Sequence, residues 1–187
     1  MIILASQSPR RKELMEKYIS TSFLVIPSHI DEEINNNISP LENVINIAKA
    51  KGMDIAKDYK EDIVISCDTV VILNNKIYGK PENKIEAFNM LKELSNKTHE
   101  VISAYWIFYK DISISKYVSS KVTFNNLSDE LINQYVDTLS PLDKAGGYGI
   151  QDPLGNQLVK EYKGSLNNII GFPVEEIKKD LEGLKNI

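Results

Sequence analysis

Residues 63–75 read IVISCDTVVILNN, an apolar run that carries one charged residue, Asp68, and ends in two asparagines. Its β-branched residues predict strand at 63–67 continuing into 70–73. The pair Asn74-Asn75 before Ile77 predicts a hairpin turn, because asparagine tolerates the left-handed backbone that tight hairpins need. A hairpin joins antiparallel strands, so at least part of the sheet is not parallel.

Strand-length apolar runs alternate with helical periods along the rest of the chain. A second hairpin is expected at Lys110-Asp111. Further strands are expected at residues 2–5, 23–26, 101–109, 114–124 and near 158–162. Helices are expected at residues 9–18, 40–57, 83–94, 129–136 and 173–184. Interleaved helices and strands with two hairpins predict an α/β fold on a mixed sheet.

Length and composition narrow the class of protein. The chain has 187 residues, which at roughly 150 residues per domain predicts one domain over 1–187. Its net charge is −4, which argues against nucleic-acid polymers and anionic membranes as partners. A lone Cys67 excludes an intrachain disulfide, and no apolar stretch approaches the ~20 residues that span a bilayer. Without a basic segment ahead of its short apolar start, the chain is expected in the cytoplasm.

The first predicted helix begins with unusual charges. Ser8 is a good N-cap and Pro9 a good first residue, but Arg10 and Arg11 follow where acids are favoured. An anion bound there would face helix N–H groups and both guanidinium groups, with Ser6 and Ser8 adding hydroxyls. The alternative is two solvated arginines on an ordinary surface helix.

Acidic residues mark a second candidate site. Asp68 stands alone among apolar neighbours, so it must be paired, lie at a strand end or bind a metal, because burying an unpaired carboxylate is costly. The alternative is an aspartate at a bend between two strands. The cluster Asp31-Glu32-Glu33 is either a solvated loop or, if it converges with Asp68, part of a hard-oxygen site for Mg²⁺ or Mn²⁺.

Three further positions gain meaning only in combination. Lys80 precedes Pro81, which keeps the chain extended, and Lys51 lies on the second predicted helix. Residues 143–151, DKAGGYGIQ, are glycine-rich, so backbone can approach a ligand there. Walker A, Rossmann and nucleophile-elbow motifs are absent from the sequence, which disfavours P-loop enzymes, dinucleotide oxidoreductases and serine hydrolases of that type.

Together these blocks are recognisable. They are Leu4-Ala5-Ser6-Gln7-Ser8-Pro9-Arg10-Arg11, Ile30-Asp31-Glu32, Lys51, Asp68-Thr69, Lys80-Pro81, Thr98-His99-Glu100-Val101 and residues 143–151. The set resembles the Maf family of nucleotide pyrophosphatases, whose opening signature is Ser-x-Ser-Pro-Arg-Arg. The blocks stand in the family's order over almost the whole chain.

The resemblance implies an elongated mixed sheet flanked by helices, with two lobes around a central cleft, similar to inosine triphosphate pyrophosphatases. It implies hydrolysis of a nucleoside triphosphate to the monophosphate and pyrophosphate, with Mg²⁺ or Mn²⁺. Asp68 matches the catalytic carboxylate, which is the proton acceptor. Other matched active-site positions are Ser6, Arg10, Glu32, Lys51 and Lys80. The residues themselves also allow a metal held by Glu32 and Asp68, so Asp68 is expected to act as base, metal ligand or both. A homodimer and a house-cleaning role are also suggested.

Substrate choice follows from the branch of the family. Arg11, Thr69 and Gln151 match positions that mark the dTTP/UTP branch. Thr69 and Gln151 would offer a hydroxyl and an amide to the edge of uracil or thymine. The alternatives are a 7-methylguanosine triphosphate pyrophosphatase, and a nucleotide-binding regulator of septum formation with little turnover, because the family has been linked with cell-division arrest.

Overall fold

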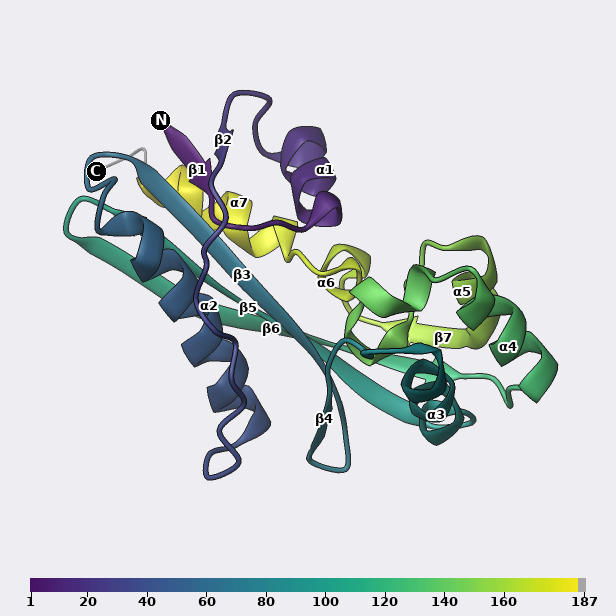
Figure 1. Cartoon of the computed structure of the whole chain (residues 1–187). Coiled ribbons are helices and arrows are strands. Elements are labelled where there is room, and N and C mark those ends of the chain that lie inside the picture. The colour runs from purple at the N-terminus through teal and green to yellow at the C-terminus, as the bar shows by residue number, and fades with distance from the viewer. Residues whose placement is uncertain (185–187) are drawn as a thin grey trace. The chain divides into compact units, whose positions relative to one another are not determined.

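The computed structural model describes residues 1–184, which form two compact units (Figure 1). Unit 1 contains Met1–Thr69, Ser103–Val118 and the chain from Gly171 onward, and unit 2 contains Val70–Ile102 and Ser119–Ile170. The last three residues of the predicted domain, 185–187, lie outside the described residues.

Unit 1 contains the first and the last of the described residues. Its elements are β1 (Ile2–Leu4), α1 (Pro9–Tyr18), β2 (Leu24–Val25), α2 (Pro40–Ala56) and α7 (Val174–Leu184). Three long strands, β3 (Ile63–Leu73), β5 (Thr98–Tyr109) and β6 (Ile112–Phe124), contribute residues to both units. The remaining elements, all in unit 2, are β4 (Lys76–Tyr78), α3 (Lys84–Leu94), α4 (Asp129–Asp137), the 3-10 helices η1 (Ser140–Asp143) and η2 (Ala145–Gly147), α5 (Pro153–Leu158), β7 (Val159–Lys163) and α6 (Leu166–Ile170).

The strands of residues 1–184 form one seven-stranded sheet in the order β2-β1-β3-β5-β6-β7, with β4 paired to β3. β1 pairs in parallel with β2 and β3, whereas β3–β4 and β6–β7 are antiparallel. The predicted α/β class and mixed sheet are therefore confirmed. The predicted hairpin turn is present too, because Asn74 and Asn75 both have positive φ (50° and 62°) and Leu73 pairs with Lys76.

All five predicted helices are present within a residue of their expected bounds. Local signals account for this: Ser39 and Glu42 form a capping box at the start of α2, with Ser39 Oγ accepting from Glu42 N at 3.2 Å. The sequence analysis did not predict the short helices α5 and α6, which lack a full amphipathic period. Its alternative for Asp68, a bend between two strands, is wrong, because β3 runs without a break through that residue.

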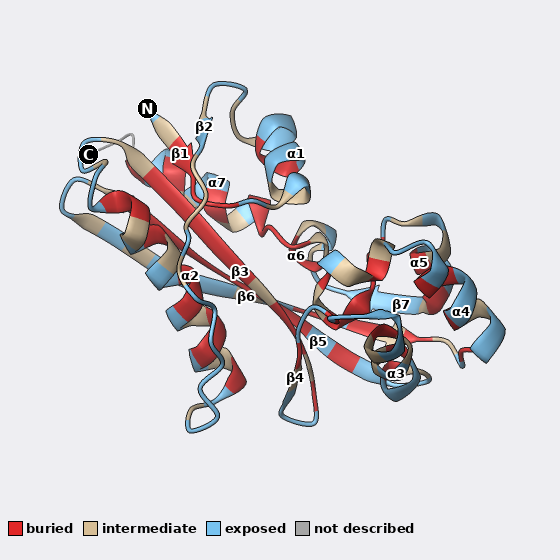
Figure 2. Cartoon of the chain, in the orientation of Figure 1, coloured by how far each residue is buried: buried red, intermediate tan, exposed pale blue. Residues whose placement is uncertain are grey.

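The two faces of the sheet in unit 1 are covered by different helices. Trp106 on β5 packs against α2, where a Cβ on Gly52 would overlap the indole ring. The neighbouring Tyr105 points the other way and donates a 2.7 Å hydrogen bond to Asp180 of α7. Figure 2 shows β3 as an almost continuously buried strand, consistent with cover on both faces.

Unit 2 has its own apolar core. Helices α3 and α4 contribute to it, together with the second halves of β3 and β6 and the first half of β5, and Phe124 and Tyr148 lie within it. His99 lies in this core, with its Nε2 2.7 Å from Tyr148 Oη and its ring edge-on to Phe124. In the described part of the chain, no helix has the length and apolarity needed to cross a membrane.

Candidate active site

The candidate site in unit 1 lies where β1 ends and β3 continues. The last β1 pair is Leu4 with Ile65, and Ala5 N still donates to Ile65 O at 2.8 Å. Beyond this point the chain turns through Ser6 to α1, while β3 carries on through Asp68 and Thr69. Side chains that follow the end of a parallel strand commonly form ligand sites in α/β proteins.

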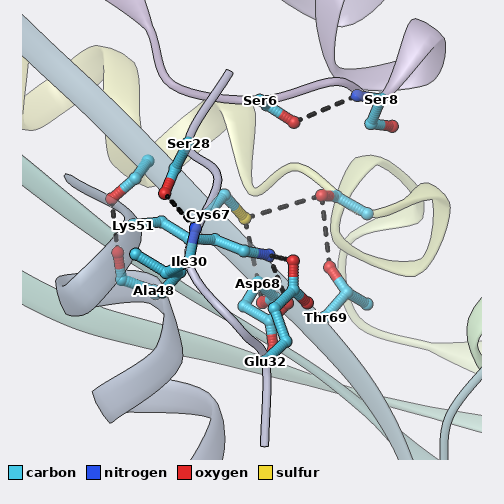
Figure 3. Close-up of polar contacts among 12 residues, drawn as sticks. Ser6, Ser8, Ser28, Ile30, Glu32, Ala48, Lys51, Cys67, Asp68 and Thr69 are labelled. Atoms are coloured by element: carbon cyan, nitrogen blue, oxygen red, sulfur yellow. Dashed lines mark hydrogen bonds and ion pairs between the residues drawn. The ribbon is translucent and has the colours of Figure 1, made fainter. Parts of the chain in front are cut away.

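A lysine joins two carboxylates at this position (Figure 3). Lys51 Nζ lies 3.0 Å from Asp68 Oδ1 and 2.7 Å from Glu32 Oε1. Asp68 comes from β3, Lys51 from α2 and Glu32 from the coil between β2 and α2. The ion pair explains how Asp68 can lie among apolar residues, because Lys51 compensates its charge.

The alternation of β3 aims Asp68 at α2. Ser66, two residues earlier on the same face, donates a 2.6 Å hydrogen bond to the Ala48 carbonyl of that helix. Gly52 allows α2 to lie close to the sheet, since any larger residue would collide with Trp106. The short helix-to-sheet distance lets Lys51 reach Asp68.

Asp68 and Glu32 are the two carboxylates at this position that would be able to hold a divalent cation. In residues 1–184 no group of three or more His, Cys, Asp or Glu side chains is arranged to hold a metal. Mg²⁺, however, is typically bound through one or two carboxylates plus substrate phosphates. Asp68 and Glu32 supply that donor set, both within 3.0 Å of one ammonium nitrogen.

Arg11 makes three hydrogen bonds on the opposite face of β3. Its Nε donates to the Gly171 carbonyl at 2.9 Å, Nη1 to Ser6 Oγ at 3.3 Å and Nη2 to Thr69 Oγ1 at 3.2 Å. Thr69 Oγ1 also lies 3.2 Å from the Gly171 carbonyl and 2.8 Å from Ser103 Oγ. Arg11 is therefore fixed on β3, not a solvated arginine.

Gly171 has a backbone conformation that favours glycine, with φ of 121°. A Cβ there would lie 3.5 Å from Thr69 Oγ1, in ordinary contact, so the backbone angle is the stronger constraint. Cys67 Sγ also points at this carbonyl, at 3.6 Å. Cys67 is buried, and burial raises the pKa of its thiol, which favours the protonated form.

The start of α1 completes this part of the site. Ser8 is the N-cap and accepts from Arg11 N at 3.4 Å, while Ser8 N donates to Ser6 Oγ at 3.2 Å (Figure 3). Ser6 is buried and Arg10, in the first turn, is half-buried. Unit 1 thus holds most of the predicted site residues: Ser6, Ser8, Arg10, Arg11, Glu32, Lys51, Asp68 and Thr69.

Two predicted site residues, Lys80 and Gln151, belong to unit 2 and are exposed. Gln151 follows a buried glycine-rich loop that a polar network stabilises. Lys144 Nζ, itself buried, donates to Ser140 Oγ at 2.9 Å and to Asp143 Oδ1 at 2.8 Å, and lies 3.6 Å from Asp152 Oδ2.

Tyr135 links the same network to the loop backbone. Its Oη accepts from Gly149 N at 2.8 Å and donates to Asp152 Oδ2 at 2.7 Å. Burial raises the pKa of Tyr135 well above its usual value, which keeps the donating proton in place. Gly149 and Asp152, which flank Ile150-Gln151, are therefore both held by hydrogen bonds to Tyr135.

Sequence reasoning missed Ser103, Gly171 and the Lys144 network. Ser103 had a signal of the same kind as Asp68, because it is a polar residue inside the apolar run Val101–Ala104 of β5. The Gly171 carbonyl had none, since its role depends on where α6 delivers the backbone.

These features define a class of protein: an α/β fold with an acid–lysine cluster and a fixed arginine where its first strand ends. The family model described as Maf-like protein matches residues 1–184. The chain belongs to this Maf family, as the resemblance predicted.

Two relatives illustrate the similarity. A dTTP/UTP pyrophosphatase from Pyrococcus furiosus is 45% identical over 181 residues, covering 97% of this chain and 94% of the relative. A dTTP/UTP pyrophosphatase from Thermosipho africanus is 46% identical over 176 residues, covering 94% and 89%. A crystal structure of a nucleoside-triphosphatase / dITP/XTP pyrophosphatase from Mycobacterium abscessus matches 98% of this chain and 97% of that one, at 11% identity and a TM-score of 0.48, too weak a likeness for further inference.

Proposed function

We propose that this chain is a pyrophosphatase that hydrolyses dTTP and UTP to the nucleoside monophosphate and pyrophosphate. The observation that carries the proposal is the pairing of Asp68 and Glu32 through Lys51, on a chain 45% identical over nearly its full length to a dTTP/UTP pyrophosphatase. A house-cleaning role in the cytoplasm, on surplus or modified pyrimidine nucleotides, accords with this activity. The suggested homodimer stays a prediction.

Asp68 is the proposed proton acceptor. Within residues 1–184 its side chain bonds to Lys51 through Oδ1, which leaves Oδ2 to accept a proton from an attacking water. Lys51 fixes the orientation of the carboxylate through this ion pair. A carboxylate held in one orientation needs little reorganisation when the water is deprotonated.

Cationic side chains are proposed to neutralise the negative charge of the triphosphate. Arg11 is half-buried, and its partners in the described chain are two hydroxyls and a carbonyl, so no carboxylate neutralises it. Arg10 lies one residue away, and Lys51 and Lys80 are the further candidates. Such groups stabilise charge on the departing pyrophosphate.

A divalent cation is the proposed cofactor. Glu32 and Asp68 would hold it together with phosphate oxygens, since hard oxygen donors suit Mg²⁺ and Mn²⁺. When bound, such an ion polarises a phosphoryl oxygen and lowers the pKa of a coordinated water. Its removal by EDTA is expected to abolish turnover and leave the fold unchanged.

Gln151 is the proposed contact to the base. Its exposed amide offers both a donor and an acceptor, which suits the O2, N3–H and O4 edge of uracil or thymine. The Lys144 network holds the loop before it. A fixed amide leaves polar groups unpaired with the wrong base, and that selects against other nucleotides.

The test is pyrophosphate release from dTTP, UTP, CTP, GTP and 7-methyl-GTP, with Mg²⁺, Mn²⁺ or EDTA. Metal-dependent release led by dTTP and UTP is the expected result. Faster release from 7-methyl-GTP than from dTTP and UTP would indicate a 7-methylguanosine triphosphate pyrophosphatase instead. No release from a folded protein that still binds nucleotides would favour the regulator over the enzyme.

Asp68→Asn tests the catalytic assignment. It keeps the shape of the side chain and removes the base, so turnover should fall by at least about 1,000-fold. Asp58→Asn is the matched control, because it removes an exposed carboxylate just after α2, outside the candidate site, and should keep the wild-type rate. A near-normal rate for Asp68→Asn would exclude Asp68 as the base.

A further inference from the structure

The hydroxyl group of Thr69 has a full set of hydrogen-bond partners inside the protein. It can donate one proton and accept two. The Gly171 carbonyl, 3.2 Å away, can accept the Thr69 proton. Arg11 Nη2 can only donate, and it takes one lone pair at 3.2 Å. Ser103 Oγ, at 2.8 Å, is the third partner, and either of these two hydroxyls could be the donor.

This arrangement conflicts with the predicted role of Thr69. The pattern of the dTTP/UTP branch suggested that its hydroxyl pairs with the edge of the base. A hydroxyl that three protein partners surround at 2.8 to 3.2 Å has no position left for a pyrimidine. Any effect of Thr69 on the substrate must therefore pass through a residue that it holds.

Arg11 is the residue that Thr69 holds. Its guanidinium has five N–H donors, and three are bonded to Gly171 O, Ser6 Oγ and Thr69 Oγ1. Two donors remain, one on each terminal nitrogen. Because none of its partners in residues 1–184 is a carboxylate, the full positive charge is available to an anion.

We infer that Ser103 and Thr69 are positioning residues that aim Arg11 at the phosphates of the substrate. Ser103, on β5, is completely buried and hydrogen-bonds with Thr69, and Thr69 in turn accepts from Arg11. The chain of hydroxyls fixes one end of the guanidinium, and the Gly171 carbonyl and Ser6 fix the rest. The inference rests on the proposed function for the identity of the anion, a nucleoside triphosphate.

The phosphate contact separates this role from a base contact. Inorganic triphosphate has no base, so its affinity reports on the phosphate contact alone. Thr69→Val removes the hydroxyl at nearly constant shape and should weaken calorimetric binding of inorganic triphosphate with Mg²⁺ by about 10-fold. Ser103→Ala should weaken it by about 3-fold, and Thr69→Ser, which keeps the hydroxyl, should bind like the wild type.

Ser120→Ala is the matched control. Ser120 is also a buried serine on a strand, but its hydroxyl bonds with Ser165 and Asn168 of unit 2, whereas Thr69 and Arg11 belong to unit 1. It should lose stability without losing triphosphate affinity. An equal loss of affinity in Ser120→Ala and Ser103→Ala would reduce Ser103 to a general structural role and overturn the inference.

A double-mutant cycle tests whether the effect passes through Arg11. In an Arg11→Met background, Ser103→Ala and Thr69→Val should each change triphosphate affinity by less than about 2-fold. Independent, multiplicative losses would contradict the inference. So would a Thr69→Val variant that changes the preference for dTTP over other bases but binds inorganic triphosphate normally.

The two proposals fail separately. If the wild type binds triphosphate and the cycle shows coupling, yet dTTP is not hydrolysed, the positioning role stands and the proposed activity is wrong. If dTTP is hydrolysed and the cycle shows no coupling, the activity stands and the positioning role is wrong. Melting temperatures of all variants identify any that fail to fold, and Arg11→Lys replaces Arg11→Met in that case.

Discussion

Replacing Lys51 with methionine should destabilise the protein more than any single change to its two carboxylate partners. Lys51 is 12% exposed and Asp68 11%, whereas Glu32 is 46% exposed. Removing one partner of a buried pair leaves an uncompensated charge, which costs about 3–5 kcal/mol. Because Asp68 keeps a little contact with solvent, the lower end, about 3 kcal/mol, is expected.

The carboxylates should respond differently. Glu32→Gln removes a half-exposed partner, so it should cost less than about 1 kcal/mol. Asp68→Asn leaves Lys51 paired with Glu32 and should cost about 1 kcal/mol. Combining Lys51→Met with Asp68→Asn should recover much of the loss, since the isolated carboxylate is gone.

Urea unfolding provides the measurement. Trp106 is the sole tryptophan of the chain and lies buried against α2 in unit 1, so its fluorescence reports on the packing next to Lys51. A loss below about 1 kcal/mol in Lys51→Met, or no recovery in the double variant, would refute the view that Lys51 compensates a buried Asp68.

Three other predictions concern stability. Burial lowers the pKa of His99 to about 4, so the unfolded state binds more protons between about pH 6.5 and 4, and stability should fall by about 3 kcal/mol across that range; acid unfolding of His99→Phe should lack most of this dependence. Gly52→Ala places a methyl group against the Trp106 ring and should cost about 1–3 kcal/mol in urea unfolding, together with a changed Trp106 emission; an unaffected stability would show that α2 can move outward freely. Lys144→Met leaves the carboxylates of Asp143 and Asp152 without the buried cation that they share. It should lower both the melting temperature and the preference for dTTP, because Gln151 follows that loop. A lower melting temperature with an unchanged preference would show that the Lys144 network does not position Gln151.

Local signals explain why so much of the fold was predictable. Helix starts at Ser8-Pro9, Ser39-Pro40 and Ser128 need only a capping side chain and the next few residues. The hairpin at Asn74-Asn75 needs only two residues that accept positive φ. The short helices α5 and α6 depend on tertiary packing, which a local stretch of sequence does not reveal.

The candidate site divides in the same way. The charge of Asp68 in an apolar run indicated that the side chain needs a partner, and Lys51 of α2 is that partner. Thr69 was assigned to the base because a resemblance marks the position but not the direction of its hydroxyl. That direction depends on Ser103 and Gly171, which are distant from Thr69 in sequence and meet it only in the folded chain.

The most direct test of the account is dTTP hydrolysis in ¹⁸O-labelled water, with products analysed by mass spectrometry. Attack on the α-phosphorus by a water that Asp68 deprotonates predicts dTMP carrying one ¹⁸O and unlabelled pyrophosphate. Formation of dTDP with labelled phosphate would contradict the proposed reaction, and so would an absence of hydrolysis in protein whose fold and metal content are intact.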